Sequence, residues 1–337
     1  MNFLASTSCT GDGLSTSSSS IKEGDCVIVY EGMNSMKAVY VSTKGRYDNR
    51  FGTFKHESWI GKPFGSKVTS SNKGASGWVL LLRPTPELWT QVLRHRTQIL
   101  YLADISMVVT HLDLKPGSVV LESGTGSGSL THSLVRAVAP TGHVHTFEFH
   151  AGRAEDAAAE FKQHGLSGLV TVTQRNIEEL GFPDTLHGAA DGVFLDLPAP
   201  HKVVPSAAAC LRPNGRFCAF SPCIEQVQRT AEALSSSGFT DLITYECLLR
   251  ECEDVGGVAG GKTGEKAGAV GTSAETACGQ EANEPPQGQG QGAAPGCALA
   301  AAGDAAVGRS RVVSWRPSAE ARGHTGYLIF ARKFVCG

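Results

Sequence analysis

Apolar residues recur in two different patterns along this chain, and the pattern changes near residue 84. Before that point the apolar runs are short and separated by turn residues. These runs are Cys26–Tyr30, Met36–Ser42, Phe51–Phe54 and Trp78–Leu82. Short runs bounded by Gly, Asn and Pro are typical of strands. We therefore predict a small β-rich N-terminal domain over residues 21–83, with a turn at Gly45–Asn49.

A helical segment follows over residues 84–113. Pro84 and Pro86 mark its beginning, and Lys115-Pro116-Gly117 ends it, because Pro and Gly interrupt helices. We predict that the residues between these signals are helical.

From residue 118 to 250, apolar runs of strand length alternate with segments of helix length. The predicted strands are Val119–Glu122, His143–Phe149, Val170–Gln174, Gly192–Asp196, Arg216–Phe220 and Leu242–Leu248. The predicted helices are Ser129–Ala139, Arg153–His164, Val203–Leu211 and Ile224–Ser235. Alternating strands and helices build a doubly wound parallel sheet, so the predicted fold class is α/β and Rossmann-like.

Two segments lack the apolar residues that a packed core requires. Residues 1–20 are rich in Ser, Thr and Gly, and residues 251–312 are rich in Gly, Ala and Gln. Such segments bury too little surface to offset the entropy lost on ordering, so we predict that both are disordered. An apolar run at Gly323–Phe330 predicts a final strand. The second segment is then an insertion in the hairpin between the last two strands of a second domain, 84–337.

The charge balance and the cysteines exclude several classes of protein. The 337 residues carry a net charge of −2 and a pI of about 6.6, so nucleic-acid binding requires a local basic patch or a basic partner. None of the ten cysteines forms a C-x-x-C pair, and we expect no metal. No apolar run approaches the ~18 residues of a membrane span. The N-terminus also lacks the features of a signal peptide.

The clearest chemical motif is a glycine loop over residues Glu122–Ser129, which follows a predicted strand and opens a predicted helix. Glycines there let the backbone adopt positive φ and approach a ligand closely. Dehydrogenases share a G-x-G loop, but here the spacing is G-x-G-x-G and an acidic residue precedes Gly124 by two positions. The loop resembles the first motif of class I methyltransferases, which bind S-adenosylmethionine, and Gly124 and Gly126 are its expected cofactor contacts.

Polar side chains at the ends of two further strands are suited to bind a nucleoside. Glu148 ends the second strand, and a carboxylate there can accept hydrogen bonds from both ribose hydroxyls. Asn176 follows the third strand, where this architecture places an adenine ring, with Ile177 beside it. Structural alternatives are a solvated strand end for Glu148 and a turn cap for Asn176.

Asp196 ends the fourth strand in Asp196-Leu-Pro-Ala-Pro200 and is the candidate catalytic residue. Ligands of open α/β sheets bind at the carboxyl ends of strands. The stretch resembles the Asp/Asn-Pro-Pro-aromatic motif of amino-group methyltransferases, in which prolines stiffen the loop. If the acceptor is adenine N1, its lone pair is already free. A carboxylate bonded to the exocyclic amine would orient the base and stabilise the positive charge that develops on it.

Several stretches together resemble one family, the catalytic subunit of eukaryotic tRNA (adenine-N1)-methyltransferase, which acts on the T-loop adenosine at position 58 of tRNA. The stretches are Ile21–Asp25, Gly61–Lys67, Pro84–Trp89, His95–Tyr101, Glu122–Ser129, Asp196–Pro200, Phe220–Thr230 and Gly323–Leu328. They are distributed over residues 21–250 and 323–332, and together they are far more specific than the glycine loop alone.

The resemblance implies a set of cofactor contacts and a set of tRNA contacts. The cofactor contacts are Gln98, Leu100, Ser127, Gly128, Ser129, Glu148, Arg153, Asn176, Ile177 and Asp196. Asn176 stands where relatives carry Asp. The implied tRNA contacts are Ser221, Pro222 and Gly326, and we add the compact basic group Arg94, His95 and Arg96. A solvated helix face is the alternative for that trio.

The resemblance also implies partners. The family enzyme is a nuclear heterotetramer of two catalytic and two non-catalytic, tRNA-binding subunits, which suits a chain without basic excess. The target base must be extruded to expose its Watson–Crick edge. Two other functions compete. An isoaspartyl repair methyltransferase has a similar glycine loop, but Asp196 would repel its carboxyl acceptor. A non-catalytic tRNA-binding paralogue would be expected to lose the loop or Asp196, and both are present.

Overall fold

The computed structural model describes residues 20–32, 35–72, 77–249, 252–254, 315–317 and 326–334. The N-terminal segment predicted to be disordered lies outside these residues, apart from Ser20. Most of the predicted insertion also lies outside them. The described residues form one compact unit of residues up to 249 and from 322 onward, and a second unit over 250–321.

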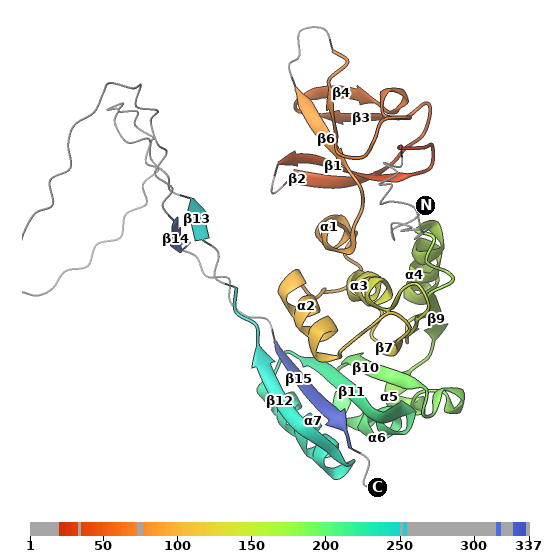
Figure 1. The fold of residues 1–337 in the computed structure, drawn as a ribbon, viewed down its shortest axis with the longest axis vertical. Helices are drawn as coiled ribbons and strands as arrows, with labels where there is room; N and C mark the ends of the chain where they lie inside the picture. Colours follow the sequence, from red (N-terminus) through yellow and green to blue (C-terminus); the bar gives the residue numbers. More distant parts are fainter. Residues whose placement is uncertain are drawn as a thin grey trace, which may run out of the picture. The chain divides into compact units, whose positions relative to one another are not determined.

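The N-terminal β region consists of a four-stranded antiparallel sheet and a short hairpin (Figure 1). The sheet has the order β2-β1-β6-β5, with β1 at Cys26–Gly32, β2 at Ser35–Tyr40, β5 at Ser66–Thr69 and β6 at Trp78–Leu82. The hairpin pairs β3 (Arg46–Asn49) with β4 (Gly52–Lys55), and the 3-10 turn η1 (His56–Ser58) follows.

Two predictions for this region were wrong. The residues expected to form a turn at 45–49 include strand β3, and strand β5 was not predicted. Each strand is four residues long and contains one strongly buried apolar side chain, Tyr47 in β3 and Val68 in β5. One apolar residue among polar ones gives too weak a period-2 signal, and the pairing partner decides the structure.

Strand β1 belongs to two hydrophobic cores at once. Val27 and Val29 point into the core of the β region, which is centred on Trp59 and Phe54. Cys26 and Ile28 point the other way and pack in the cluster that contains Trp89 of α1. Side chains of a strand alternate between its two faces, so one strand can serve both cores. The β region is therefore packed against the larger sheet domain.

The segment predicted as continuous helix over 84–113 contains two helices, α1 (Pro86–Val92) and α2 (Leu102–His111), separated by nine non-helical residues. Helix α1 begins as expected, with the Thr85 hydroxyl accepting from Leu88 N. The helix ends because the backbone N–H groups of Arg96 and Thr97 bind the Ser127 hydroxyl instead of helical carbonyls. A tertiary contact thus overrides local helical preference.

The predicted doubly wound sheet is confirmed. Seven strands lie in the order β12-β15-β11-β10-β7-β8-β9. Their bounds are β7 Val119–Ser123, β8 His143–Glu148, β9 Val170–Gln174, β10 Ala190–Asp196, β11 Leu211–Ser221, β12 Phe239–Glu246 and β15 Tyr327–Lys333. All neighbours are parallel except β15, which runs antiparallel between β11 and β12. The ladder between β10 and β11 skips residues 212–215, the predicted turn.

Helices cover both faces of this sheet (Figure 1). Helices α2, α3 (Ser129–Val138) and α4 (Ala151–Gln163) contribute to one core cluster. Helices α5 (Ile177–Leu180), α6 (Pro200–Cys210) and α7 (Ile224–Ser236) contribute to the other, with the 3-10 turn η2 (Asp184–Leu186) before β10. Successive residues of a strand belong to different core clusters, as Val120 belongs to the first cluster and Leu121 to the second. The helix α5 was not predicted because four residues carry no helical period.

The second unit contains a small antiparallel pair, β13 (Cys252–Asp254) with β14 (Trp315–Pro317). The prediction of disorder was therefore wrong for residues 252–254, and the remainder of the predicted insertion lies outside the described residues. Because β12 and β15 are neighbours in the sheet, the predicted location of the insertion between the last two strands is confirmed. Within the described residues, no helix is long and apolar enough to cross a membrane.

Candidate active site

A cavity of about 450 Å³ opens at the carboxyl ends of the adjacent strands β10, β7, β8 and β9. The chain leaves β7 toward β8 on one side and reaches β10 on the other, so this is the switch point where open α/β sheets bind ligands. The volume is typical of small-molecule sites, which span about 300–1,000 Å³. The lining residues are Thr97, Gln98, Ser123, Gly124, Gly126, Phe147, Glu148, Phe149, Arg153, Arg175, Asn176, Ile177, Glu178, Asp196, Leu197 and Pro198.

The glycine loop forms the floor of this cavity. Gly124, Gly126 and Gly128 have φ values of 98°, 53° and 76°, which side chains with a Cβ rarely adopt. A Cβ on Gly124 would lie 2.4 Å from the backbone oxygen of Asp196, so only glycine permits this approach. The predicted positive φ is therefore confirmed, and the predicted close approach to a ligand stays a prediction. The glycine loop also touches the end of β10 directly.

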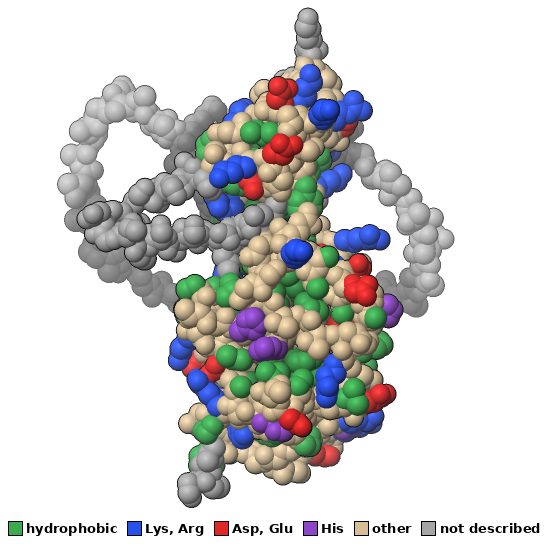
Figure 2. All heavy atoms as spheres, turned by 90° about the vertical axis from the view of Figure 1, so that its right-hand side faces the viewer, with side chains coloured by type: hydrophobic (Ala, Val, Ile, Leu, Met, Phe, Trp, Pro, Cys, Tyr) green, Lys and Arg blue, Asp and Glu red, His purple; other side chains and the backbone are tan. Residues whose placement is uncertain are grey.

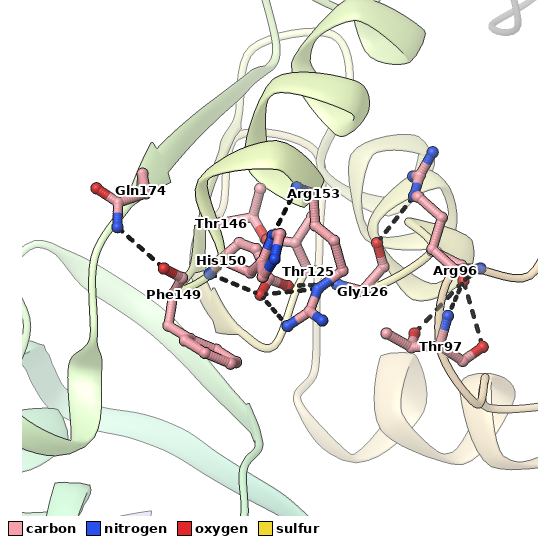
Figure 3. Close-up of polar contacts among 11 residues, drawn as sticks. Arg96, Thr97, Thr125, Gly126, Thr146, Phe149, His150, Arg153 and Gln174 are labelled. Carbon is pink, nitrogen blue, oxygen red and sulfur yellow. Dashed lines mark hydrogen bonds and ion pairs between the residues drawn. The ribbon is translucent and has the colours of Figure 1, made fainter.

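The segment between α1 and α2 holds the glycine loop from outside (Figure 3). The Ser127 hydroxyl accepts from Arg96 N at 2.8 Å and from Thr97 N at 3.1 Å. The guanidinium of Arg96 donates to the carbonyl of Gly126 at 3.2 Å and pairs with Glu160 at 2.9 Å. Only 13% of the Arg96 side chain is exposed. This cation therefore supports the loop, and its predicted contact with tRNA stays a prediction. Arg94 and His95 are exposed but not helical.

Glu148 lies at the end of β8 and is 3% exposed. Its Oε1 accepts from His150 N and from the Arg153 guanidinium at 2.6 Å, and its Oε2 accepts from Gly126 N at 3.1 Å. Figure 3 shows Arg153 and His150 on one side of Gly126 and Arg96 on the other. A carboxylate offers about four acceptor sites, so Oε2 has capacity for a ligand hydroxyl. Oε1 can accept a hydrogen bond from a second ligand hydroxyl only if it also keeps the hydrogen bonds from Arg153.

Asn176 has the capping role that was considered for it, and its predicted contact with adenine stays a prediction. Its side-chain oxygen accepts from Glu178 N and caps α5, the turn-capping alternative. It also lines the cavity. Ile177 is 2% exposed and packs in the core beneath the same wall. The cap fixes the start of α5, so one residue can shape the backbone and face a ligand.

The Asp196 carboxylate faces the same cavity and makes no hydrogen bond within the described part of the chain. Its side chain is accessible to water because it lines the cavity, yet protein atoms surround it closely. The resulting desolvation raises its pKa to about 6. At neutral pH the group is therefore mostly ionised, with its acceptor sites open toward the cavity.

Two polar side chains that the sequence did not single out hold the loop after Asp196. Glu178 of α5 accepts from Ala199 N at 2.7 Å, and the amide of Gln226 of α7 donates to Pro198 O at 2.9 Å. Gln226 also accepts from Cys223 N, which begins its own helix. The loop is thus fixed by two helices, and the prolines are not its only restraint.

Glu122 lies behind the glycine loop and is 1% exposed. Burial raises its pKa to about 7, while a hydrogen bond from the Thr131 hydroxyl at 2.7 Å opposes this change. The nearby carboxylates of Asp196 and Glu148 raise the pKa further. The carboxyl group is therefore held partly protonated near neutral pH.

The remaining predicted cofactor residues lie around the loop. Gln98 lines the main cavity, and Leu100, Ser127, Gly128 and Ser129 line a smaller adjoining space of about 30 Å³. The roles of all these residues in ligand binding stay predictions. Pro222 is exposed, whereas Ser221 and Gly326 are buried. The predicted tRNA contacts at these three positions also stay predictions.

Sequence reasoning missed several residues that line the cavity. Thr97, Phe149, Arg175, Glu178, Leu197 and Pro198 belong to this group. Pro198 lies two positions after Asp196 and the other five directly adjoin a predicted site residue, so proximity in the sequence was an available signal. Phe149 is 59% exposed and carries the Arg153 guanidinium over its ring at 5.0 Å.

Comparison with known proteins places the chain in a family. Residues 77–333 match the family model of the tRNA methyltransferase complex GCD14 subunit. The tRNA (adenine(58)-N(1))-methyltransferase catalytic subunit of Cryptococcus neoformans is 46% identical over 235 residues, which are 69% of this chain and 53% of the relative. The corresponding subunit of Dictyostelium discoideum is 44% identical, covering 68% of this chain and 74% of the relative. The chain thus spans about half the length of the fungal relative.

Solved structures share the fold. The tRNA (m1A58) methyltransferase TrmI of Aquifex aeolicus superposes with a TM-score of 0.64 at 21% identity, covering 94% of this chain and all of that one. A SAM-dependent O-methyltransferase of Thermotoga maritima gives a TM-score of 0.69 at 24% identity, covering 94% and 96%. These likenesses confirm the predicted class I methyltransferase architecture. The family model covers more than half of the chain, and the chain therefore belongs to the family of the tRNA methyltransferase complex GCD14 subunit.

Proposed function

We propose that this chain is the catalytic subunit of a tRNA (adenine-N1)-methyltransferase that methylates adenosine 58 in the T-loop with S-adenosylmethionine. The observation that carries the proposal is the Asp196 carboxylate, ionised and without a described partner, in the cavity that the glycine loop floors. The relatives that match most of this chain bear the name of that activity.

The residues present fit this cofactor. The glycine loop floors the cavity with a backbone that bears no side chains at Gly124 and Gly126, and Glu148 keeps acceptor capacity on Oε2 for a ribose hydroxyl. Asn176 and Ile177 form the wall expected to meet adenine. When bound, the cofactor supplies a methyl group on a sulfonium sulfur, a good leaving group. The chain itself contributes position, because in-line displacement depends on how the reacting atoms are aligned.

Asp196 has two roles in the proposed reaction, which are to orient the target base and to stabilise the charge that develops on it. Adenine N1 attacks with a free lone pair, so no proton has to leave first, and positive charge spreads over the ring as the N–C bond forms. A carboxylate that accepts from the exocyclic amine orients the base and stabilises this charge. The same negative charge would repel the carboxyl acceptor of an isoaspartyl repair enzyme. The open carboxylate therefore favours an amino-heterocycle as substrate.

The charge distribution supports an RNA substrate. Residues 20–83 contain ten Lys and Arg and five Asp and Glu, a balance of +5, so the rest of the chain carries −7 to give the total of −2. Figure 2 shows several of these basic side chains on one face of the β region, in the upper part of the picture. A basic patch of this kind attracts phosphates. We propose that a non-catalytic subunit supplies further tRNA-binding surface in a heterotetramer of two copies each, located in the nucleus.

Methylation of T-loop tRNA by the co-expressed complex tests this proposal. Mass spectrometry of tRNA nucleosides is expected to show 1-methyladenosine with the wild-type chain and loss of nearly all of it with Asp196→Ala. Asp184→Ala removes an acid that is 96% exposed outside the cavity and is the matched control. Absence of methylation with the wild-type chain, or full methylation with Asp196→Ala, would contradict the proposal. Sedimentation of the complex tests its stoichiometry.

A further inference from the structure

A buried group of polar side chains lies behind the glycine loop, outside the cavity. It contains His132 of α3, which is 2% exposed, and His164 at the end of α4, which is fully buried. Tyr40, the last residue of β2, reaches this group from the N-terminal β region. Trp89 packs on both imidazole rings, with centroids 5.8 Å and 4.6 Å away. None of the three polar residues lines the cavity, so binding and chemistry there do not explain them.

The hydrogen bonds of this group form a continuous chain. His132 Nδ1 lies 2.6 Å from the carbonyl oxygen of Gly128, His132 Nε2 lies 2.8 Å from His164 Nδ1, and His164 Nε2 lies 3.1 Å from the Tyr40 hydroxyl. Burial lowers the pKa of His132 to about 4 and that of His164 to about 3. Both imidazoles are therefore neutral near neutral pH, and each carries one N–H.

The carbonyl at one end determines the direction of the whole chain. A carbonyl only accepts, so His132 must carry its proton on Nδ1, and its Nε2 must accept. His164 then donates from Nδ1 and accepts at Nε2, so the Tyr40 hydroxyl is the donor at the other end. One tautomer is thus required at each histidine. Loss of the Tyr40 hydroxyl removes this donor and, with it, the hydrogen bond that links the β region to the chain of imidazoles.

A second anchor lies beside the first. The Arg96 guanidinium donates to the carbonyl of Gly126 and is held in turn by Glu160 of α4 (Figure 3). The carbonyls of two left-handed glycines, Gly126 and Gly128, are therefore both bound from behind by side chains. A loop that is ordered before binding does not have to lose that entropy when the ligand arrives.

We infer that Tyr40, His164 and His132 are positioning residues through which the N-terminal β region orders the cofactor loop. The inference rests on the proposed function, since it concerns affinity for S-adenosylmethionine. Metal binding is the competing use, because ligand atoms of His132, Glu160 and His164 lie within 4.8 Å of one another. The pairing of the imidazoles with each other and of Glu160 with Arg96 favours the hydrogen-bonded form.

Calorimetry with the full chain tests the inference. Tyr40→Phe is expected to weaken S-adenosylmethionine binding on the order of tenfold, the size of one lost hydrogen bond. Tyr47→Phe is the matched control, because its hydroxyl donates to Glu31 inside the β region and has no link to the loop. Equal affinity of Tyr40→Phe and wild type would overturn the inference, as would an equal loss in both variants.

A spectroscopic signature separates this inference from the proposed function. In ¹⁵N-histidine NMR spectra of the wild-type chain, His132 and His164 are both expected to show the neutral Nδ1–H tautomer, with His164 perturbed by Tyr40→Phe and not by Tyr47→Phe. An Nε2–H tautomer at either residue, or one equivalent of bound zinc that is lost in His132→Gln, would overturn the inference. A wild-type chain with the expected tautomers but no affinity for S-adenosylmethionine would contradict the proposed function instead.

Discussion

The two loops that meet at the centre of the cavity differ in how their polar groups are used. In the glycine loop after β7, the Ser127 hydroxyl and the Gly126 carbonyl bind the segment at 96–97, and the Gly126 N–H binds Glu148. In the loop after β10, the backbone is fixed by Glu178 and Gln226, but the Asp196 carboxylate itself has no partner among the described residues. This difference fits the proposal that the glycine loop holds the cofactor and that the loop after β10 presents an open carboxylate to the substrate.

The difference suggests that the glycine loop determines cofactor affinity and that the loop after β10 determines turnover. A loop whose groups are already bonded contributes affinity through its shape and costs little on binding. A carboxylate that has no protein partner can accept from a donor on the substrate, and this interaction is strong where the bound ligands exclude water. The loops touch where Gly124 approaches the Asp196 carbonyl. Changes in one loop should therefore affect affinity, and changes in the other should affect turnover.

The largest effect is expected from Asp196→Asn, which keeps the shape of the side chain and removes its charge. Loss of one preorganised electrostatic group lowers kcat about 10²- to 10³-fold in other enzymes. We expect a decrease of that size in kcat for T-loop methylation, with the affinity for S-adenosylmethionine within a factor of three of wild type. Single-turnover rates and calorimetry measure the two quantities. A large loss of cofactor affinity with unchanged kcat would reverse the assignment of the loops.

The complementary change is Gly126→Val in the glycine loop. Its φ of 53° is strained for a β-branched residue, and a Cβ would lie 2.6 Å from the Thr97 hydroxyl. Strain of this kind costs about 1–3 kcal/mol, so cofactor affinity should fall at least tenfold. Gly168→Val is the control, because a Cβ there meets nothing within 4 Å. Normal cofactor affinity in Gly126→Val would show that the loop is not part of the binding site.

The pH dependence of the reaction sharpens the role of Asp196. Its pKa in the ligand-free chain is raised to about 6, and the ionised form is the proposed active one. The value of kcat/KM should then fall about tenfold per pH unit below 6 and level off above it. Glu122, with a pKa near 7, is the other carboxyl that could titrate here. The decrease in kcat/KM at low pH should persist in Glu122→Gln and vanish in Asp196→Asn. A decrease that vanishes in Glu122→Gln instead would contradict the assignment.

Much of this arrangement could be predicted from the sequence, because it depends on periodic or local signals. The order of strands and helices, the glycine loop and the positions of Glu148 and Asp196 at strand ends all follow from patterns along the chain. The restraints on the two loops do not. Along the sequence Arg96 belongs to a compact basic group, yet in the fold it binds a glutamate 64 residues away and a glycine carbonyl. His132, His164 and Tyr40 have no shared motif, and only folding brings them together.

The smallest effect expected concerns Glu122, which supports the glycine loop from within the core. Its pKa rises from the ordinary 4.5 to about 7 in the folded chain. The folded state therefore binds more protons than the unfolded state between these values, and stability falls as pH rises through that interval. Glu122→Gln cannot ionise and retains an oxygen that can accept from Thr131. Its urea midpoint should change less than that of wild type between pH 5 and pH 8. An identical pH dependence in both chains would show that burial does not raise the pKa of Glu122 and that its carboxylate stays ionised from pH 5 to pH 8.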